Sequence, residues 1–237
     1  MAFQEKLYNV ALEYNLKLND LQLNNFSKYY DLLIETNKIH NLTAITEENE
    51  VIFKHFIDSI LPENIFEDNS KIIDIGCGAG FPSIPLKIMN NSLNITAVDS
   101  VNKKTEFVKN AVNKLHLSDK FEVIHSRIED LARNKTYREQ YDYVVSRAVA
   151  PLNIVLEYSA PFLKNGGKII CYKGSSYSDE LKTAENALKI LNLSIEYTKE
   201  YYLKEIDALR IVICIKKNST INDKYPRGGN KPRLSPL

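Results

Sequence analysis

The sequence predicts an α/β fold in which a mostly parallel, doubly wound sheet of seven strands follows a helical N-terminal segment. Residues 1–66 carry apolar side chains at helical spacing. From Lys71 onward, short apolar runs alternate with amphipathic segments, which is typical of parallel strands whose connecting helices cover both faces of a sheet. No convincing helix separates the last two apolar runs, so the last strand is expected to be antiparallel.

The first part of the chain is predicted to contain at least two helices. Asp20 is a candidate cap for one of them, and Thr46, followed by two glutamates, is a candidate start for another that ends at Pro62. We therefore divide the chain into an N-terminal helical extension packed on the core (1–66), an α/β core (67–217) and a basic, Pro/Gly-rich C-terminal arm (218–237).

The core is predicted to alternate strands and helices. Its apolar runs are short and rich in β-branched and aromatic residues, as buried strands are. The strands are expected at 71–76, 94–99, 121–125, 141–146, 167–172, 193–198 and 209–215. The helices are expected at 81–90, 102–115, 127–133, 151–163 and 178–191.

Composition restricts the class of protein. The 237 residues are 44% hydrophobic with a formal net charge of +1, which allows a sizeable core and indicates no globally basic surface. No apolar run approaches the ~20 residues needed to span a bilayer, and the N-terminus lacks the apolar stretch of a signal peptide. Cys77, Cys171 and Cys214 are widely spaced and favour buried thiols over a disulfide or a metal site. We expect a monomeric cytoplasmic protein that does not associate with a membrane.

The stretch DIGCGAGFPSIP (74–85) holds three of the eight glycines of the chain. Gly76 ends the first predicted strand, and Pro82 and Pro85 suit the first turn of the helix that follows. Glycine is needed where the backbone adopts positive φ or approaches another group closely. The loop therefore lies at the carboxyl edge of the sheet, where open α/β sheets bind ligands.

The residues around this loop indicate the kind of ligand. Phe81 stands where a dinucleotide fingerprint has its third glycine, which makes NAD the weaker alternative. Asp74 would repel a pyrophosphate but suits a sulfonium or ammonium group. Asp99, at the end of the second strand, can accept hydrogen bonds from both ribose hydroxyls of an adenosine. Together these features resemble the S-adenosylmethionine site of Rossmann-like class I methyltransferases.

The segment after the fourth strand, YDYVVSRAVAP (141–151), bears on the methyl acceptor. Enzymes that methylate exocyclic amines of bases resemble one another in an Asn/Asp-Pro-Pro-aromatic turn at this place, and this segment lacks that turn. It also lacks the nucleophilic cysteine that methylation of pyrimidine C5 needs. Without a covalent nucleophile or an obvious base, the acceptor must already be nucleophilic. Guanine N7 is such an atom, and its methylation depends mostly on alignment.

Several segments, in order and nearly end to end, resemble the bacterial glucose-inhibited division B (GidB, RsmG) family. These are HFIDSI (55–60), IDIGCGAGFPSIPLKI (73–88), SRIED (126–130), DYVVSRAVAPL (142–152), YKG (172–174) and KYPR…KP…PL (224–237). The resemblance implies an S-adenosylmethionine-dependent methyltransferase acting on guanine N7 of 16S rRNA in the small ribosomal subunit. The cofactor-site residues it implies are Gly76, Gly78, Phe81, Ile128, Glu129 and Arg147.

A purely structural role is the alternative for Phe81, Glu129 and Arg147. Arg147 would orient acceptor and cofactor without a general base, and Ile128 stands where the family is expected to have alanine. Phe81 could instead be a core aromatic residue, and Glu129 a solvated acid at a helix start. The cluster His55, Asp58 and Ser59 either supports the acceptor side or is a helix-packing cluster.

The C-terminal arm is the predicted RNA-binding segment. From Lys216 to the end there are six basic residues and one acidic residue, a local charge of +5. A flexible basic arm suits phosphate contacts and base stacking, with a merely solubilising tail as the alternative. We expect its deletion from residue 224 to weaken RNA binding and to leave cofactor binding nearly unchanged. The candidate residues are Lys224, Tyr225, Arg227, Lys231 and Arg233.

Three other functions stay open at this point. A methyltransferase with another acceptor would share the glycine loop, although the basic arm argues against a small-molecule acceptor. A non-catalytic ribosome-assembly factor could keep the fold, although an intact loop argues against a dead site. An NAD oxidoreductase is disfavoured by Phe81 and Asp74.

Overall fold

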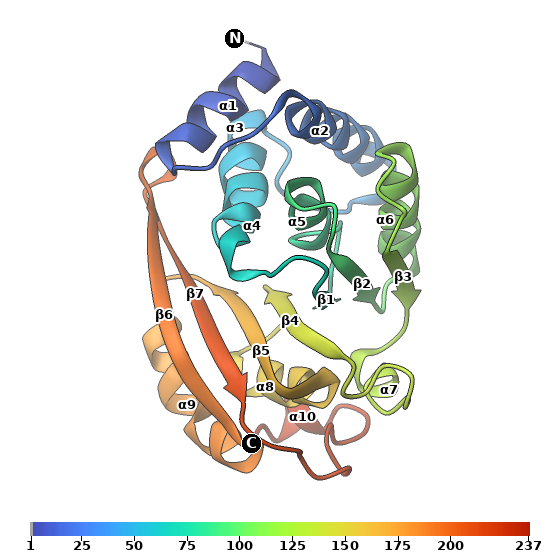
Figure 1. The fold of residues 1–237 in the computed structure, drawn as a ribbon, viewed down its shortest axis with the longest axis vertical. Coiled ribbons are helices and arrows are strands. Elements are labelled where there is room, and N and C mark those ends of the chain that lie inside the picture. The colour runs from blue at the N-terminus through green and yellow to red at the C-terminus, as the bar shows by residue number, and fades with distance from the viewer. Residues whose placement is uncertain (1) are drawn as a thin grey trace.

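The computed structural model describes residues 2–237, and within them seven strands form one sheet in the order β3-β2-β1-β4-β5-β7-β6 (Figure 1). β7 is antiparallel to both of its neighbours, and the other adjacent strands pair in parallel. The predicted α/β class with an antiparallel last strand is therefore confirmed. The strands are β1 (Lys71–Ile75), β2 (Asn94–Asp99), β3 (Phe121–His125), β4 (Tyr141–Arg147), β5 (Leu163–Lys173), β6 (Leu193–Leu203) and β7 (Ala208–Lys217).

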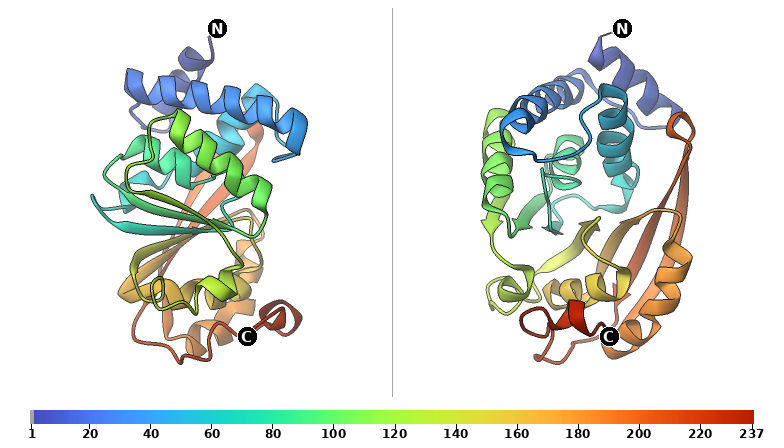
Figure 2. Two further views of the ribbon diagram at one scale, coloured as in Figure 1. Left: turned by 90° about the vertical axis from the view of Figure 1, so that its right-hand side faces the viewer. Right: turned by 180° about the vertical axis from the view of Figure 1, so that it is seen from behind.

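Helices cover both faces of the sheet, as Figure 2 shows edge-on. One face packs under α1 (Phe3–Glu13), α2 (Asp20–His40), α5 (Ser83–Met89) and α6 (Asn102–Lys114), whose apolar side chains share one core cluster. The opposite face packs on a second cluster. Its helices are α7 (Ile128–Leu131), α8 (Leu152–Ser159) and α9 (Tyr177–Ile190).

The N-terminal helices begin one residue away from the predicted caps. Asn19, not Asp20, caps α2, because its side-chain oxygen accepts from the Gln22 backbone N–H at 2.9 Å. In turn, the Gln22 side-chain oxygen accepts from the Asn19 backbone N–H at 2.9 Å. The next helix begins after Glu47, whose carboxylate accepts from the Glu50 N–H at 2.9 Å, and not at Thr46.

A π-helix, η1 (Val51–Ile57), lies between the short helices α3 (Glu48–Glu50) and α4 (Asp58–Ile60). Its wider turn was not part of the sequence expectation, since apolar spacing alone does not separate it from an α-helix. π-helical turns are rare and frequent at functional sites. η1 and α4 place several polar side chains above the carboxyl end of β4.

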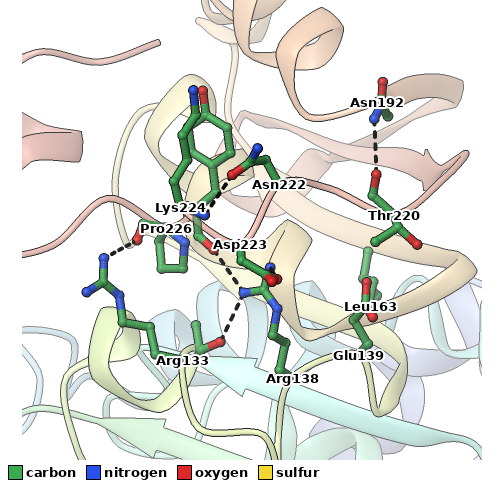
Figure 3. Close-up of polar contacts among 12 residues, drawn as sticks. Arg133, Arg138, Glu139, Leu163, Asn192, Thr220, Asn222, Asp223, Lys224 and Pro226 are labelled. Carbon is green, nitrogen blue, oxygen red and sulfur yellow. Dashed lines mark hydrogen bonds and ion pairs between the residues drawn. The ribbon is translucent and has the colours of Figure 1, made fainter.

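The C-terminal arm packs on the core. Arg133 donates to the Pro226 carbonyl at 2.7 Å and Arg138 to the Tyr225 carbonyl at 2.9 Å, as Figure 3 shows from the side of α7. Tyr225 belongs to the core cluster around α8. The expectation of a flexible arm is therefore wrong for this stretch, because buried contacts hold it. The arm ends in α10 (Lys231–Leu234), preceded by a turn.

Candidate active site

The glycine loop turns sharply between β1 and α5. Gly76 has φ +71° and Gly78 has φ +57°, both in the left-handed region. A Cβ at Gly76 would lie 2.7 Å from the Val149 side chain, so the loop approaches the segment after β4 closely. A Cβ at Gly78 would meet nothing within 4 Å. The loop thus needs glycine for its shape at both positions, and it leaves open space beside Gly78.

Asp99 ends β2 directly beside this loop and is largely buried. Its two carboxylate oxygens accept from the Gly78 N–H and the Val101 N–H, each at 2.9 Å. A carboxylate offers about four acceptor positions, so two remain for donors of a ligand. This is the arrangement that two ribose hydroxyls would require.

A cavity of about 640 Å³ lies in front of Asp99, and we name it the Asp99 cavity. Several predicted cofactor residues from different elements meet on its wall. They are Gly76, Asp99, Ile128 and Glu129. The wall also includes residues that the sequence did not single out for this role: Ser100, Val101, Lys104, Arg127, Ala148, Val149, Tyr158, Asn230 and Leu234.

Glu129 is buried at the first turn of α7 and is not a solvated acid. Its Oε1 accepts from Arg127 at 3.2 Å and from the Tyr158 hydroxyl at 3.4 Å. The carboxylate is thereby held at the wall of the Asp99 cavity. Arg127 immediately precedes Ile128 in the chain, so this neighbour could have been found from the same segment.

A second cavity, of about 610 Å³, lies on the other side of the segment after β4. We name it the Arg147 cavity. Ala148 and Val149 line both cavities, so this short segment forms a common wall. The other side chains that matter below are Lys54, His55, Asp58, Arg147, Lys173 and Arg210.

Arg147, at the end of β4, is held by three acceptors of η1 and α4. It donates to the Lys54 carbonyl at 2.9 Å, to Asp58 at 3.1 Å and to Nδ1 of His55 at 3.1 Å. Asp58 also contacts Arg210 at 3.3 Å. Two members of the polar cluster expected from the sequence, His55 and Asp58, thus hold Arg147 directly, whereas the Ser59 hydroxyl donates to the His55 carbonyl.

His55 is neutral in this network. Because arginine can only donate, Nδ1 of His55 must accept, and Nε2 carries the proton toward the Thr43 hydroxyl 3.0 Å away. Burial, reinforced by the Arg147 charge, lowers the pKa of His55 to about 3. The imidazole therefore positions Arg147 and has no free nitrogen for proton transfer.

Three predicted cofactor residues, Gly78, Phe81 and Asp74, line neither cavity. Phe81 is buried, its ring stacked on His55 at 4.3 Å between centroids and lying 5.0 Å from the Arg147 guanidinium. Asp74 is completely buried and accepts from the Ser83 N–H at 3.2 Å, and burial raises its pKa to about 7. Direct ligand contact by these residues stays a prediction. Phe81 packs below Arg147, and Asp74 supports the start of α5.

The predicted RNA-binding residues separate into two groups. Tyr225 is buried and Arg227 forms an ion pair with Glu157, so stacking on a base would require this part to leave the core. Lys224 and Lys231 are exposed. Arg233 is exposed as well and lines the Asp99 cavity, a position that its basic character alone did not indicate.

Other kinds of site find no support in the described chain. Residues 2–237 contain no group of His, Cys, Asp and Glu side chains arranged to hold a metal ion. The same residues contain no helix long and apolar enough to cross a membrane.

Comparison with known proteins gives consistent results. The family model GidB, described as rRNA small subunit methyltransferase G, matches residues 22–206. Proteins named ribosomal RNA small subunit methyltransferase G are 43% identical in Lactobacillus acidophilus and 44% identical in a Thermoanaerobacter species. These alignments cover 95% and 98% of both chains, respectively.

Solved structures support the fold. A predicted O-methyltransferase of Agrobacterium tumefaciens has a TM-score of 0.55 at 16% identity, covering 70% of this chain and 82% of that one. The StiE O-MT structure has a TM-score of 0.56 at 14% identity, covering 84% and 93%. At such identities the likeness shows a methyltransferase-type fold and no more.

Proposed function

Since this chain belongs to the rRNA small subunit methyltransferase G (GidB) family, we propose that it transfers a methyl group from S-adenosylmethionine to N7 of a guanine in 16S rRNA. One observation supports this assignment above the others. The Asp99 cavity and the Arg147 cavity meet at the common wall of Ala148 and Val149. A methyl donor in the first cavity and an acceptor base in the second would meet beside these two residues, where the cavities adjoin.

The residues of the Asp99 cavity fit the proposed cofactor. Asp99 keeps two acceptor positions for ribose hydroxyls, and the open space beside Gly78 admits the ligand next to the loop. Ile128 offers an apolar side chain to the adenine ring, and Glu129 offers a buried carboxylate. S-adenosylmethionine would supply an electrophilic methyl group carried on a sulfonium.

The chemistry asks little of the protein beyond alignment. The in-plane lone pair of guanine N7 forms the new bond to carbon while the bond from carbon to sulfur breaks and its electron pair stays on sulfur. N7 carries no proton, so no general base is needed. This agrees with a site in which His55 is neutral and fully engaged. Correct placement of the two reactants is then the main source of acceleration.

Arg147 is the side chain proposed to orient the acceptor. Its guanidinium has five N–H groups, and three contact acceptors of η1 and α4. The remaining N–H groups are free to contact a base in the cavity that Arg147 lines. Guanine presents O6 beside N7 on the same edge. An Arg147 contact to O6 would therefore position the base and leave the N7 lone pair available.

The RNA itself would be held by basic side chains around the sites. Lys224 and Lys231 are exposed, whereas Lys54 and Lys173 at the Arg147 cavity are already paired with Glu50 and Glu180. The two exposed lysines can neutralise phosphates and release counterions, which makes RNA affinity dependent on salt. The proposed partner is the small ribosomal subunit or its 16S rRNA.

Transfer of labelled methyl groups from S-adenosylmethionine tests the function. The acceptors are small subunits from cells that lack this protein and, in parallel, naked 16S rRNA, with the modified nucleoside identified by mass spectrometry. Label in 7-methylguanosine is expected, and the two substrates distinguish free RNA from the assembled particle. Label in another nucleoside would contradict the N7 assignment. Cofactor binding without any transfer would favour an assembly factor.

A further inference from the structure

We propose that the C-terminal segment 230–234 is part of the cofactor site and closes the adenosine side of the Asp99 cavity. This inference rests on the proposed function, because it takes the adenosine part of S-adenosylmethionine as the ligand. Asn230, Arg233 and Leu234 line the cavity together with Asp99 and Glu129. These side chains belong to a segment far from the glycine loop in sequence.

A buried ion pair fixes the position of this segment. Glu157 of α8 has a side chain only 1% exposed, and it accepts from the Arg227 guanidinium at 2.7 to 3.2 Å and from the Arg227 backbone N–H at 2.7 Å. Arg133 and Arg138 donate to the Pro226 and Tyr225 carbonyls just before Arg227 (Figure 3). The chain therefore enters α10 from a fixed point three residues before Asn230.

Arg127 then connects the segment to Glu129. The Arg127 guanidinium donates to Glu129 at 3.2 Å and also to the Asn230 side chain at 3.0 Å. The Tyr158 hydroxyl donates to Glu129 at 3.4 Å, and Tyr158 and Arg233 line the same cavity. Asn230 is thus a positioning residue that acts on Glu129 through Arg127, and Arg233 is part of the same wall.

Leu234 adds an apolar surface. It is 82% exposed and lines the same cavity as Ile128. An aromatic base that contacts both side chains would remove their apolar surface from water. The adenine ring of the proposed cofactor is such a base.

This arrangement revises the expectation that the arm serves RNA alone. Removal of residues 224–237 would take away part of the cavity wall, so cofactor binding should weaken as well. Lys231 lies on the same short helix but does not line the cavity. It therefore serves as a matched control, a cation on the segment that leaves the wall intact.

Calorimetry on full-length variants tests the inference, with S-adenosylhomocysteine and 5′-methylthioadenosine as probes. The combined N230A, R233A and L234A variant is expected to bind both probes about tenfold more weakly, since the Arg127–Asn230 hydrogen bond, the Arg233 side chain at the wall and an apolar contact are lost. L234A alone should lose part of this affinity. K231A should bind both probes within about twofold of the unaltered chain.

Kinetics separate cofactor positioning from a general loss of structure. On small subunits, the combined variant should raise KM for S-adenosylmethionine about tenfold with kcat nearly unchanged, and R233K should recover part of the loss. Wild-type affinity in the combined variant would overturn the inference and leave the proposed function standing. Failure of the unaltered chain to bind either probe would overturn both.

Discussion

The Arg147 cavity and the Asp99 cavity have a common wall, yet they are built in different ways. Around Arg147 the polar groups are buried and satisfy one another, with the Arg147 and Asp58 side chains only 13% and 10% exposed. At the outer edge of the Asp99 cavity, Arg127 and Leu234 are mostly exposed. A fixed donor array suits the orientation of an acceptor base, whereas a cofactor must enter and leave. The difference suits the Arg147 cavity to holding its donor groups in fixed positions, and the Asp99 cavity to the exchange of a ligand.

Substitution of Arg147 should separate the two cavities most strongly. R147A is expected to lower methyl transfer to small subunits by about 100-fold, because the acceptor base loses its orienting group. Its affinity for S-adenosylhomocysteine should change by less than about threefold, since Arg147 does not line the Asp99 cavity. Transfer assays and calorimetry measure the two effects.

R147K is the matched variant for this experiment. Lysine keeps the charge but lacks the planar fork that reaches His55, Asp58 and the Lys54 carbonyl together. It should therefore recover only a small part of the activity. Equal losses of cofactor binding and methyl transfer in R147A would show that Arg147 serves both cavities, as the sequence resemblance implies.

The ion pair between Arg227 and Glu157, which holds the C-terminal arm beside the Asp99 cavity, should contribute strongly to the free energy of unfolding. R227A leaves the buried Glu157 carboxylate without its partner, which is expected to lower the free energy of unfolding by about 3 kcal/mol in urea titrations. K109A removes an exposed pair with Glu106 and should change it by less than about 0.5 kcal/mol. If the two variants lost similar stability, the arm would not be anchored by this pair.

The glycine loop offers a finer test of the common wall. G76A requires an alanine at φ +71° and pushes against Val149, so it should weaken cofactor binding and also disturb the Arg147 cavity. G78A carries only the strain of positive φ, about 1–2 kcal/mol, and places its methyl group in open space.

The expected readouts of the two glycine variants differ. G78A should raise KM for S-adenosylmethionine with little change in kcat, because its methyl group would enter the open space proposed for the ligand. G76A should change both parameters, because Val149 belongs to both cavities. Identical kinetic profiles would indicate that the wall tolerates the displacement of Val149.

The parts that sequence predicts well are those determined locally. Alternating apolar runs located the strands of the sheet, and the loop with Asp99 located the Asp99 cavity. β6 is longer than predicted, because polar residues such as Lys199 and Glu200 continue this exposed edge strand, and β5 begins earlier than predicted, at Leu163. Apolar periodicity carries no signal for such strand ends.

The parts that sequence missed depend on partners distant in the chain. Arg227 is one basic residue among several in the arm, and only the buried Glu157, 70 residues away, gives it an anchoring role. Phe81 follows the glycine loop, but its ring packs on His55 from a π-helix that apolar spacing could not indicate. Such contacts arise from tertiary packing, so no local pattern identifies them.

The pKa of Asp74 gives the smallest expected effect, since charged residues of both cavities, Arg147 and Asp99, act on it. Burial raises its pKa to about 7, while Arg147 lowers it and Asp99 raises it. Because this folded pKa lies above the unfolded value of 3.8, the folded chain binds more protons than the unfolded chain between about pH 4 and pH 7. The free energy of unfolding contributed by Asp74 therefore falls as the pH rises through this window.

The difference in unfolding free energy between each protein and its D74N counterpart isolates this titration, because asparagine cannot ionise but can still accept from Ser83. This difference changes with pH between the unfolded and the folded pKa of Asp74, and its upper midpoint reports the folded pKa. Relative to the unaltered chain, R147A should move that upper midpoint to higher pH by a fraction of a pH unit. D99N should move it to lower pH, and R147K, which keeps the charge, should leave it nearly in place. Opposite shifts would show that Asp74 is affected by the charges of both cavities from beneath the loop. Shifts of the same sign would mean that the substitutions act through altered packing, and the electrostatic link between the two cavities would fail.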